Sequence, residues 1–253
     1  MRKRYSSPMN SVPDLYLDDL VVELLAKLEK FDAANNFGSN IVDPYAAALE
    51  ASVFRHATES SWRESELHRQ KQKALMNYVG QLHQSIIGCL PGWQSFDAGT
   101  DSPDVVGVRG EQKIIAEIKN KHNTMNSNSA GETYDKLVEF LERSEFRGFI
   151  GVVVQIIGPV SKETLWKPFA PGRNRRARSD LIVMNGRPFY ALAVDEKERQ
   201  PGVSVKPDSR MESWSSWSAI DEMTSQLFSS IARNTGATVP KWVEKFIDPA
   251  IGT

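Results

Sequence analysis

The sequence predicts an α/β fold in which helices flank a mixed central β-sheet, with a helical extension at the N-terminus. Residues 149–154 form an unbroken apolar run, FIGVVV, of the kind that a fully buried central strand requires. Two shorter segments rich in β-branched residues, 104–108 and 113–119, precede that run and indicate neighbouring strands. Leucines recur at helical spacing near the N-terminus. Such an alternation along the chain favours helices packed on a sheet.

The first 60 residues are expected to form a helical subdomain or wrap. Leu17, Leu20 and Leu24 share one face of a predicted helix. Pro44 opens a second helical segment, since proline is well suited to a first helical position.

Residues 61–253 are expected to form one main domain, which begins with a long helix at 61–88. Ser60 or Ser61 is the predicted N-cap of this helix, and Glu64 completes a capping box. The last predicted helix covers the sheet. The expected strands span residues 104–108, 113–119, 148–157, 180–184 and 188–195, and the other expected helices span 133–143 and 219–233.

Composition excludes several classes of protein. Cys89 is the only cysteine, so the chain has neither an internal disulfide nor a thiolate-rich zinc site, and any metal must be held by oxygen or imidazole. No apolar run approaches the roughly 18 residues that cross a bilayer, and no signal core follows the basic start, so we expect no membrane contact and a cytoplasmic location. The formal net charge of -1 means that DNA binding would need basic residues gathered on one face.

One hairpin is expected to bring three charged side chains together. If Gly110 and Glu111 form a two-residue loop, with glycine at the first position as a type II′ turn prefers, Asp104 lies directly opposite Glu117. Directly opposed residues have Cβ atoms about 5 Å apart. Lys119 projects on the same face as Glu117, because side chains alternate along a strand.

These three side chains suit metal-assisted chemistry on a phosphate. Two carboxylates this close repel each other unless a cation lies between them, and hard oxygen ligands favour Mg²⁺, with Mn²⁺ as a substitute. A bound metal would stabilise charge on the phosphate and lower the pKa of a water molecule. Lys119 would orient or activate that water.

At these residues the chain resembles the PD-(D/E)XK nuclease superfamily, with Pro103-Asp104 matching PD and Glu117-Ile118-Lys119 matching (D/E)XK. The resemblance implies a restriction-endonuclease-like fold, whose order of helix, hairpin, helix and strand is also the order predicted here. It further implies that Asp104 and Glu117 bind Mg²⁺ and that Lys119 assists the water.

A narrower resemblance is to a family of type II restriction endonucleases that cut GGNCC. It rests on residues 97–106, DAGTDSPDVV, and 116–126, AEIKNKHNTMN, and extends from about residue 40 to about residue 200. It implies a Mg²⁺-dependent enzyme of a restriction-modification system that hydrolyses double-stranded DNA, with a cognate DNA methyltransferase acting on the same site. Residues 61–253 would then be the nuclease domain with its C-terminal helices.

Two other functions remain open on the same scaffold: a DNA repair or junction-resolving nuclease, and a catalytically inactive DNA-binding module. The complete Asp/Glu/Lys set disfavours the inactive module. Cleavage of intact duplex at one short sequence favours restriction, whereas dependence on nicks, mismatches or branches favours repair.

Many members of the superfamily add a carboxylate from the helix before the hairpin. Glu66 is our candidate for this additional catalytic residue, and Glu50 and Glu64 compete with it.

Two segments are expected to contact DNA. The first leaves the catalytic strand as a cluster of short hydrogen-bonding side chains, followed by a flexible segment at 127–131. The second holds four arginines in six residues, and guanidinium groups suit phosphate and guanine. The residues concerned are Lys121, His122, Asn123, Thr124 and Asn126 in the first segment, and Arg173, Arg175, Arg176 and Arg178 in the second.

A symmetric homodimer is expected, because the chain holds a single candidate site and a restriction cut must break both strands of a two-fold symmetric duplex.

Overall fold

In the part of the chain that the structure describes, six strands form one mixed sheet in the order β1-β2-β3-β4-β6-β5. The computed structural model describes residues 14–33, 43–54, 58–90, 92–97, 101–109, 112–158, 164–168, 175–193 and 212–246. Within these ranges β3, β4 and β6 run parallel, and the other pairings are antiparallel. The strands are β1 (Trp93–Ser95), β2 (Val105–Arg109), β3 (Gln112–Lys121), β4 (Ile150–Ile157), β5 (Thr164–Leu165) and β6 (Leu181–Asn185).

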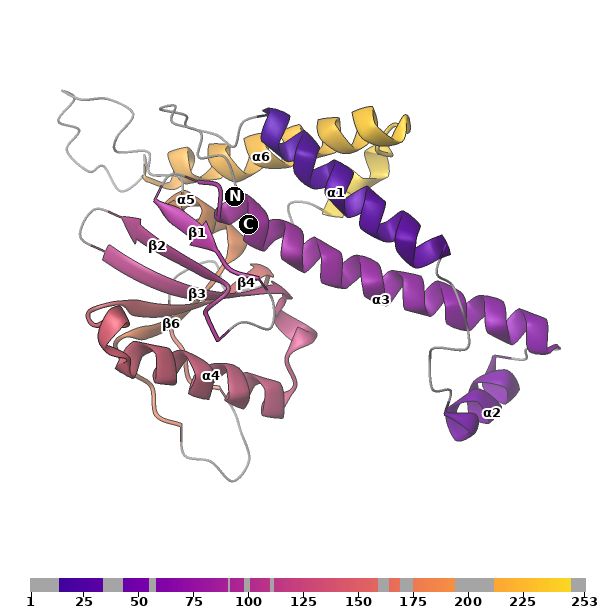
Figure 1. The fold of residues 1–253 in the computed structure, drawn as a ribbon, viewed down its shortest axis with the longest axis horizontal. Helices are drawn as coiled ribbons and strands as arrows, with labels where there is room; N and C mark the ends of the chain where they lie inside the picture. The colour runs from indigo at the N-terminus through magenta and orange to yellow at the C-terminus, as the bar shows by residue number, and fades with distance from the viewer. Residues whose placement is uncertain are drawn as a thin grey trace.

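Helices cover both faces of the sheet (Figure 1). One face carries α4, and the opposite side carries α3 with α1 and α6 beyond it. The mixed α/β architecture with a helical N-terminal region is therefore confirmed. The helices are α1 (Asp14–Ala33), α2 (Pro44–Val53), α3 (Glu59–Ile87), α4 (Ser127–Glu142), α5 (Gly186–Ala193) and α6 (Glu212–Thr235).

β3 separates two hydrophobic cores, because its side chains alternate between the faces of the sheet. Ile114, Ala116 and Ile118 pack in the core that includes α1, α3 and α5. Ile115 packs in the second core, which includes the buried face of α4. Glu117 therefore faces α4, on the side of the sheet that the alternation predicts.

The N-terminal helix belongs to the main core. Leu17 and Val21 of α1 are fully buried, and α1 packs against α3 and α6. At the C-terminal end of α6, Arg233 forms an ion pair of 2.9 Å with Asp18 of α1. Residues 14–33 are thus part of the body of the protein.

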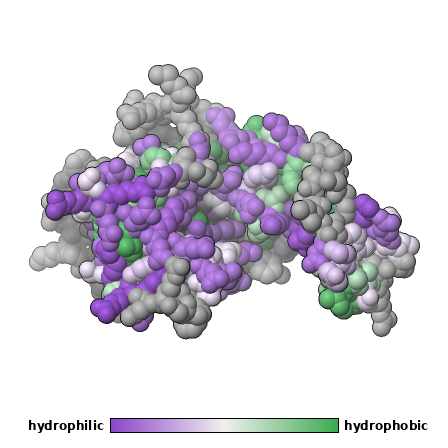
Figure 2. Space-filling view, turned by 60° about the horizontal axis from the view of Figure 1, so that its bottom comes forward, coloured by the Kyte–Doolittle hydropathy of each residue, from purple (hydrophilic) through white to green (hydrophobic). Residues whose placement is uncertain are grey.

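The second helix lies apart from the sheet, at the far end of α3 (Figure 1). None of its residues is buried. Tyr45, Leu49 and Val53 recur every four residues and are all exposed, so α2 presents an apolar stripe that the described chain leaves uncovered. Figure 2 shows this end of the molecule as an apolar area beside largely hydrophilic surface.

The strand predicted at 188–195 is wrong, since the chain forms α5 there. Among its buried residues, Phe189, Tyr190 and Ala193 recur at a helical spacing. Gly186 begins the helix where a Cβ atom would lie 2.8 Å from the carbonyl oxygen of Ile156, so the close approach to β4 requires glycine.

Two helix starts also differ from the prediction. The N-cap of α3 is Thr58, and its capping box is completed by Ser61 rather than by Glu64. The segment at 127–131, predicted to be flexible, is the first part of α4, with the Asn126 side chain accepting a hydrogen bond from the N–H of Ser129. The short strands β1 and β5 were not predicted.

Candidate active site

One β-hairpin places the two candidate carboxylates at the same end of the sheet. β2 and β3 pair with Val105 opposite Ala116, which is the register expected from a two-residue loop; the loop residues themselves lie outside the described ranges. Asp104 directly precedes β2, and its Oδ2 accepts a 2.8 Å hydrogen bond from the N–H of Ile118. This bond fixes the Asp104 carboxylate beside β3, where Glu117 is the neighbouring residue.

Burial sets the electrostatics of the pair. Glu117 is only 3% exposed. Burial, followed by the charge of Glu117, raises the pKa of the Asp104 carboxyl, while the Ile118 N–H and the ammonium groups of Lys119 and Lys136 act in the opposite direction. The two carboxylates can therefore be charged together only with cations close to them.

Two ammonium groups bind Glu117. The Nζ atom of Lys119 lies 3.4 Å from Oε2, so the predicted convergence of Lys119 with Glu117 is present. The Nζ atom of Lys136, from α4, lies only 2.6 Å from Oε1. Lys136 was not predicted, although it precedes the buried Phe140 by one helical turn and so lies at the border of the apolar face.

Buried side chains and one terminal ion pair hold α4 over this face. Tyr134, Leu137 and Phe140 are buried in the second core. Near the end of the helix, Arg143 lies over the Phe140 ring and forms an ion pair of 2.9 Å with Asp101, just before the first candidate carboxylate. The helix that carries Lys136 is therefore tied to the segment that carries the metal-ligand candidates.

The structure does not bring Glu66 to this site. Its carboxylate accepts hydrogen bonds from Arg69 and Gln70 on the same helix. Gln84, much later in α3, does reach the site, where its Nε2 donates to the backbone oxygen of Asp104 at 3.0 Å. At 1.5 Å per residue, Glu66 lies about 27 Å from Gln84 along the helix axis. The competing candidates, Glu50 and Glu64, lie in α2 and near the start of α3.

The donor set of Asp104 and Glu117 fits Mg²⁺. This ion is usually held by one or two carboxylates, with waters and substrate phosphate completing its coordination. Across the described part of the chain, no three His, Cys, Asp or Glu side chains gather into a ready-made metal cluster. An ion at this pair would thus depend on water and phosphate for its remaining ligands.

Comparison with known proteins identifies the family. The model of the Eco47II restriction endonuclease family matches residues 10–200. The chain belongs to that family. It is 32% identical over 189 residues to the type II restriction enzyme Eco47II of Escherichia coli, which covers 72% of this chain and 76% of the relative. It is 25% identical over 206 residues to the type II restriction enzyme Sau96I of Staphylococcus aureus, with coverages of 78% and 76%.

In this Eco47II-family chain, the segment predicted to contact DNA leaves the sheet at the end of β3, four residues after Glu117. Lys121 is the last residue of β3, and a single 3-10 turn, His122–Thr124, follows it. His122, Asn123 and Thr124 are exposed. Asn126 caps α4 through its side chain, so part of its hydrogen-bonding capacity serves the helix.

The arginine run of this family member is divided between structural and exposed positions. Arg175 is buried, and its guanidinium donates two hydrogen bonds to Asp135 of α4. Gly131 makes this possible, because a Cβ atom there would lie 2.7 Å from the guanidinium. Arg178 is paired with Asp180 in the same two-bond manner. Arg176 is exposed, and Arg173 lies outside the described residues.

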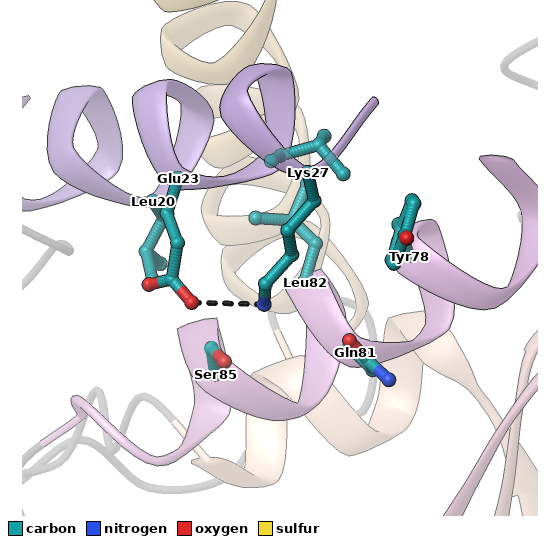
Figure 3. A pocket seen from close by; sticks show the side chains of 8 residues that line it. Leu20, Glu23, Lys27, Tyr78, Gln81, Leu82 and Ser85 are labelled. Carbon is teal, nitrogen blue, oxygen red and sulfur yellow. Dashed lines mark ion pairs between the residues drawn. The ribbon is translucent and has the colours of Figure 1, made fainter. Parts of the chain in front are cut away.

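A small pocket lies between α1 and α3, on the other side of the sheet from the carboxylates (Figure 3). Its lining includes Leu20 and Lys27 from α1 and Tyr78 and Leu82 from α3. The ion pair between Glu23 and Lys27, 2.8 Å long, borders it. None of the helices in the described ranges has the length and hydropathy needed to cross a bilayer.

Proposed function

We propose that this member of the Eco47II restriction endonuclease family is a Mg²⁺-dependent type II site-specific deoxyribonuclease. It hydrolyses phosphodiester bonds in double-stranded DNA, at GGNCC, within a restriction-modification system whose methyltransferase acts on the same sequence. One observation carries the proposal: Asp104, just before β2, is held beside Glu117 of β3 by the Ile118 N–H, and the ammonium of Lys119 lies 3.4 Å from Glu117. The sequence GGNCC rests on the family resemblance.

Each residue of the site has a role that follows from its position. Asp104 and Glu117 hold Mg²⁺, which, when bound, polarises the scissile phosphate and lowers the pKa of a water. Lys119 extends from the same strand face, where its ammonium orients the attacking water and offsets the charge that builds on the phosphate. The Ile118 N–H keeps the Asp104 carboxylate in place throughout.

DNA reaches this site along the exposed residues that follow β3. The 3-10 turn His122–Thr124 places three exposed polar side chains directly after the strand that carries the catalytic residues. Exposed Arg176 adds a positive charge on the same side of the sheet, because the Tyr134 hydroxyl of α4 donates to its backbone oxygen at 2.6 Å. Short polar side chains and arginine suit base edges and phosphate.

The active form is proposed to be a homodimer, which delivers one site to each strand. The exposed apolar stripe of α2 supports self-association, since exposed apolar patches commonly mark protein interfaces. Light scattering on the DNA complex tests this. We expect two chains per duplex, and a Leu49→Asp variant shifted towards one. One wild-type chain per duplex, with nicked circles accumulating before linear product, would contradict the dimer.

Digestion of a plasmid with known sequence tests the activity itself. We expect Mg²⁺ to support cutting, EDTA to abolish it, and the sequenced ends to fall at GGNCC. Methylation of that sequence by the cognate methyltransferase should protect the plasmid. An intact plasmid, or cleavage restricted to nicked or branched DNA, would replace this proposal with an inactive binding module or a repair nuclease.

A further inference from the structure

Glu117, a proposed metal ligand, has both carboxylate oxygens bound by lysines. Lys136 takes Oε1 at 2.6 Å, and Lys119 takes Oε2 at 3.4 Å. The Glu117 side chain is 4% exposed, so water contributes little to the stabilisation of its charge. A metal ion that binds Glu117 through Oε1 therefore competes with the ammonium of Lys136 for that oxygen.

Lys136 is able to leave while Glu117 stays. Its side chain is 40% exposed, so its ammonium has a route to solvent. Glu117, by contrast, is fixed in β3, which pairs with antiparallel β2 on one side and with parallel β4 on the other.

The position of α4 does not depend on this ion pair. Tyr134, Leu137 and Phe140 anchor the helix by burial, and Arg175 adds two hydrogen bonds to Asp135. Because other contacts already anchor α4, Lys136 is not needed to hold the helix in place. It is therefore available for a role in the site.

We propose that Lys136 is a positioning residue that couples metal binding to DNA binding. In the DNA-free protein it is the built-in counter-cation of Glu117 and competes with the metal. When DNA is bound, a backbone phosphate next to the cut takes over its ammonium, and Glu117 is free to hold the metal. Because coupling between two ligands is reciprocal, DNA then raises metal affinity and metal raises DNA affinity by the same factor. This inference rests on the proposed function.

Calorimetry with Ca²⁺, which replaces Mg²⁺ without supporting cleavage, tests the coupling. Ca²⁺ is titrated into wild type, Lys136→Met and Lys136→Gln, each with and without a GGNCC duplex. In the DNA-free state we expect both variants to bind Ca²⁺ about tenfold more tightly than wild type, on the scale of one charge-assisted hydrogen bond. The increase in affinity caused by DNA should shrink in both. Lys136→Arg, which keeps the charge, should behave like wild type.

Lys113→Met is the matched control. Lys113 is exposed at the other end of β3, and its ammonium lies near an aromatic ring, 5.8 Å from the centroid of Phe149. This variant removes the same charge and should leave Ca²⁺ affinity unchanged. Damage to the fold would weaken Ca²⁺ binding, so tighter binding cannot arise from a merely structural role of Lys136.

Unchanged or weaker Ca²⁺ binding by DNA-free Lys136→Met and Lys136→Gln would overturn the inference. If wild type nevertheless cuts the GGNCC duplex with Mg²⁺ and binds Ca²⁺ when the duplex is present, such unchanged or weaker binding by the variants removes only the role of Lys136. If wild type does neither, the proposed function itself fails.

Discussion

Replacing Lys119 with methionine should separate cleavage from folding and from DNA binding. The ammonium is partly withdrawn from water, since the side chain is 26% exposed, and it lies 3.4 Å from Glu117. Loss of one such electrostatic group from a transition state costs about 3 to 4 kcal/mol, which corresponds to a fall in cleavage rate of roughly 10²- to 10³-fold.

The cost of the same substitution to stability should be small. Lys136 remains 2.6 Å from Glu117, so the buried carboxylate keeps a partner, and methionine preserves the apolar stem. A partly exposed ion pair contributes about 1 kcal/mol or less. For a chain of this size the melting temperature should fall by at most about 2 to 4 °C.

Single-turnover cleavage of a GGNCC duplex with Mg²⁺ measures the rate, and fluorescence anisotropy with Ca²⁺ measures specific binding. We expect Lys119→Met to lose cleavage and retain binding, with Lys113→Met as a control that retains both. A Lys119→Met protein that cuts at the wild-type rate would remove Lys119 from the mechanism. A folded variant that loses duplex binding to the same degree as cleavage would place the lysine in docking instead.

Four further predictions concern charge. Asp104→Asn should have a higher melting temperature than wild type in EDTA at pH 8. Burial, and then the like charge of Glu117, raises the pKa of Asp104, so folded wild type gains stability as pH falls and the difference between the two proteins should close at acid pH. Equal melting curves at pH 8 would contradict this prediction. Burial lowers the pKa of His83 from 6.5 to about 4, so wild type should lose stability as pH falls through that window. His83→Gln keeps a polar partner for Tyr190 and should lose less stability, as measured by denaturant titrations across the same pH range. Arg176→Met should reduce the salt dependence of DNA binding by roughly one unit of slope. Arg175→Met should lower the melting temperature without changing that slope. If Arg175→Met reduced the slope in salt titrations and Arg176→Met did not, Arg175 would be the DNA contact instead of Arg176.

The hairpin could be predicted because its information is local. A short loop between two strand-like segments fixes the register, and the register alone places Asp104 near Glu117 and both on a known face. The apolar run at 149–154 was equally informative, since only a central strand buries both of its faces.

Helix α5 shows where local information ends. Its apolar residues include a proline and two aromatic residues within eight positions, and a short apolar run is compatible with a buried strand or a buried helix. The helix begins at Gly186, where the chain passes close to β4, and this tertiary contact leaves no mark in the local pattern.

The remaining parts of the site depend on tertiary contacts. Which residue of α4 meets Glu117 is decided by the docking of the helix, so Lys136 had only a weak local signal. Glu66 illustrates the converse: a helix of 29 residues reaches far beyond the sheet, and only its later turns approach the carboxylates.

Fe²⁺ in place of Mg²⁺ tests most directly whether the metal is held by Asp104 and Glu117. With ascorbate and peroxide, bound Fe²⁺ generates radicals that cut the polypeptide within a short distance of the ion, and mass spectrometry identifies the new ends. With GGNCC duplex present, we expect fragments that end near residue 104 and near residues 117–119, and none from an Asp104→Asn protein. Cuts confined to other segments, or unchanged in Asp104→Asn, would contradict a metal site at this pair.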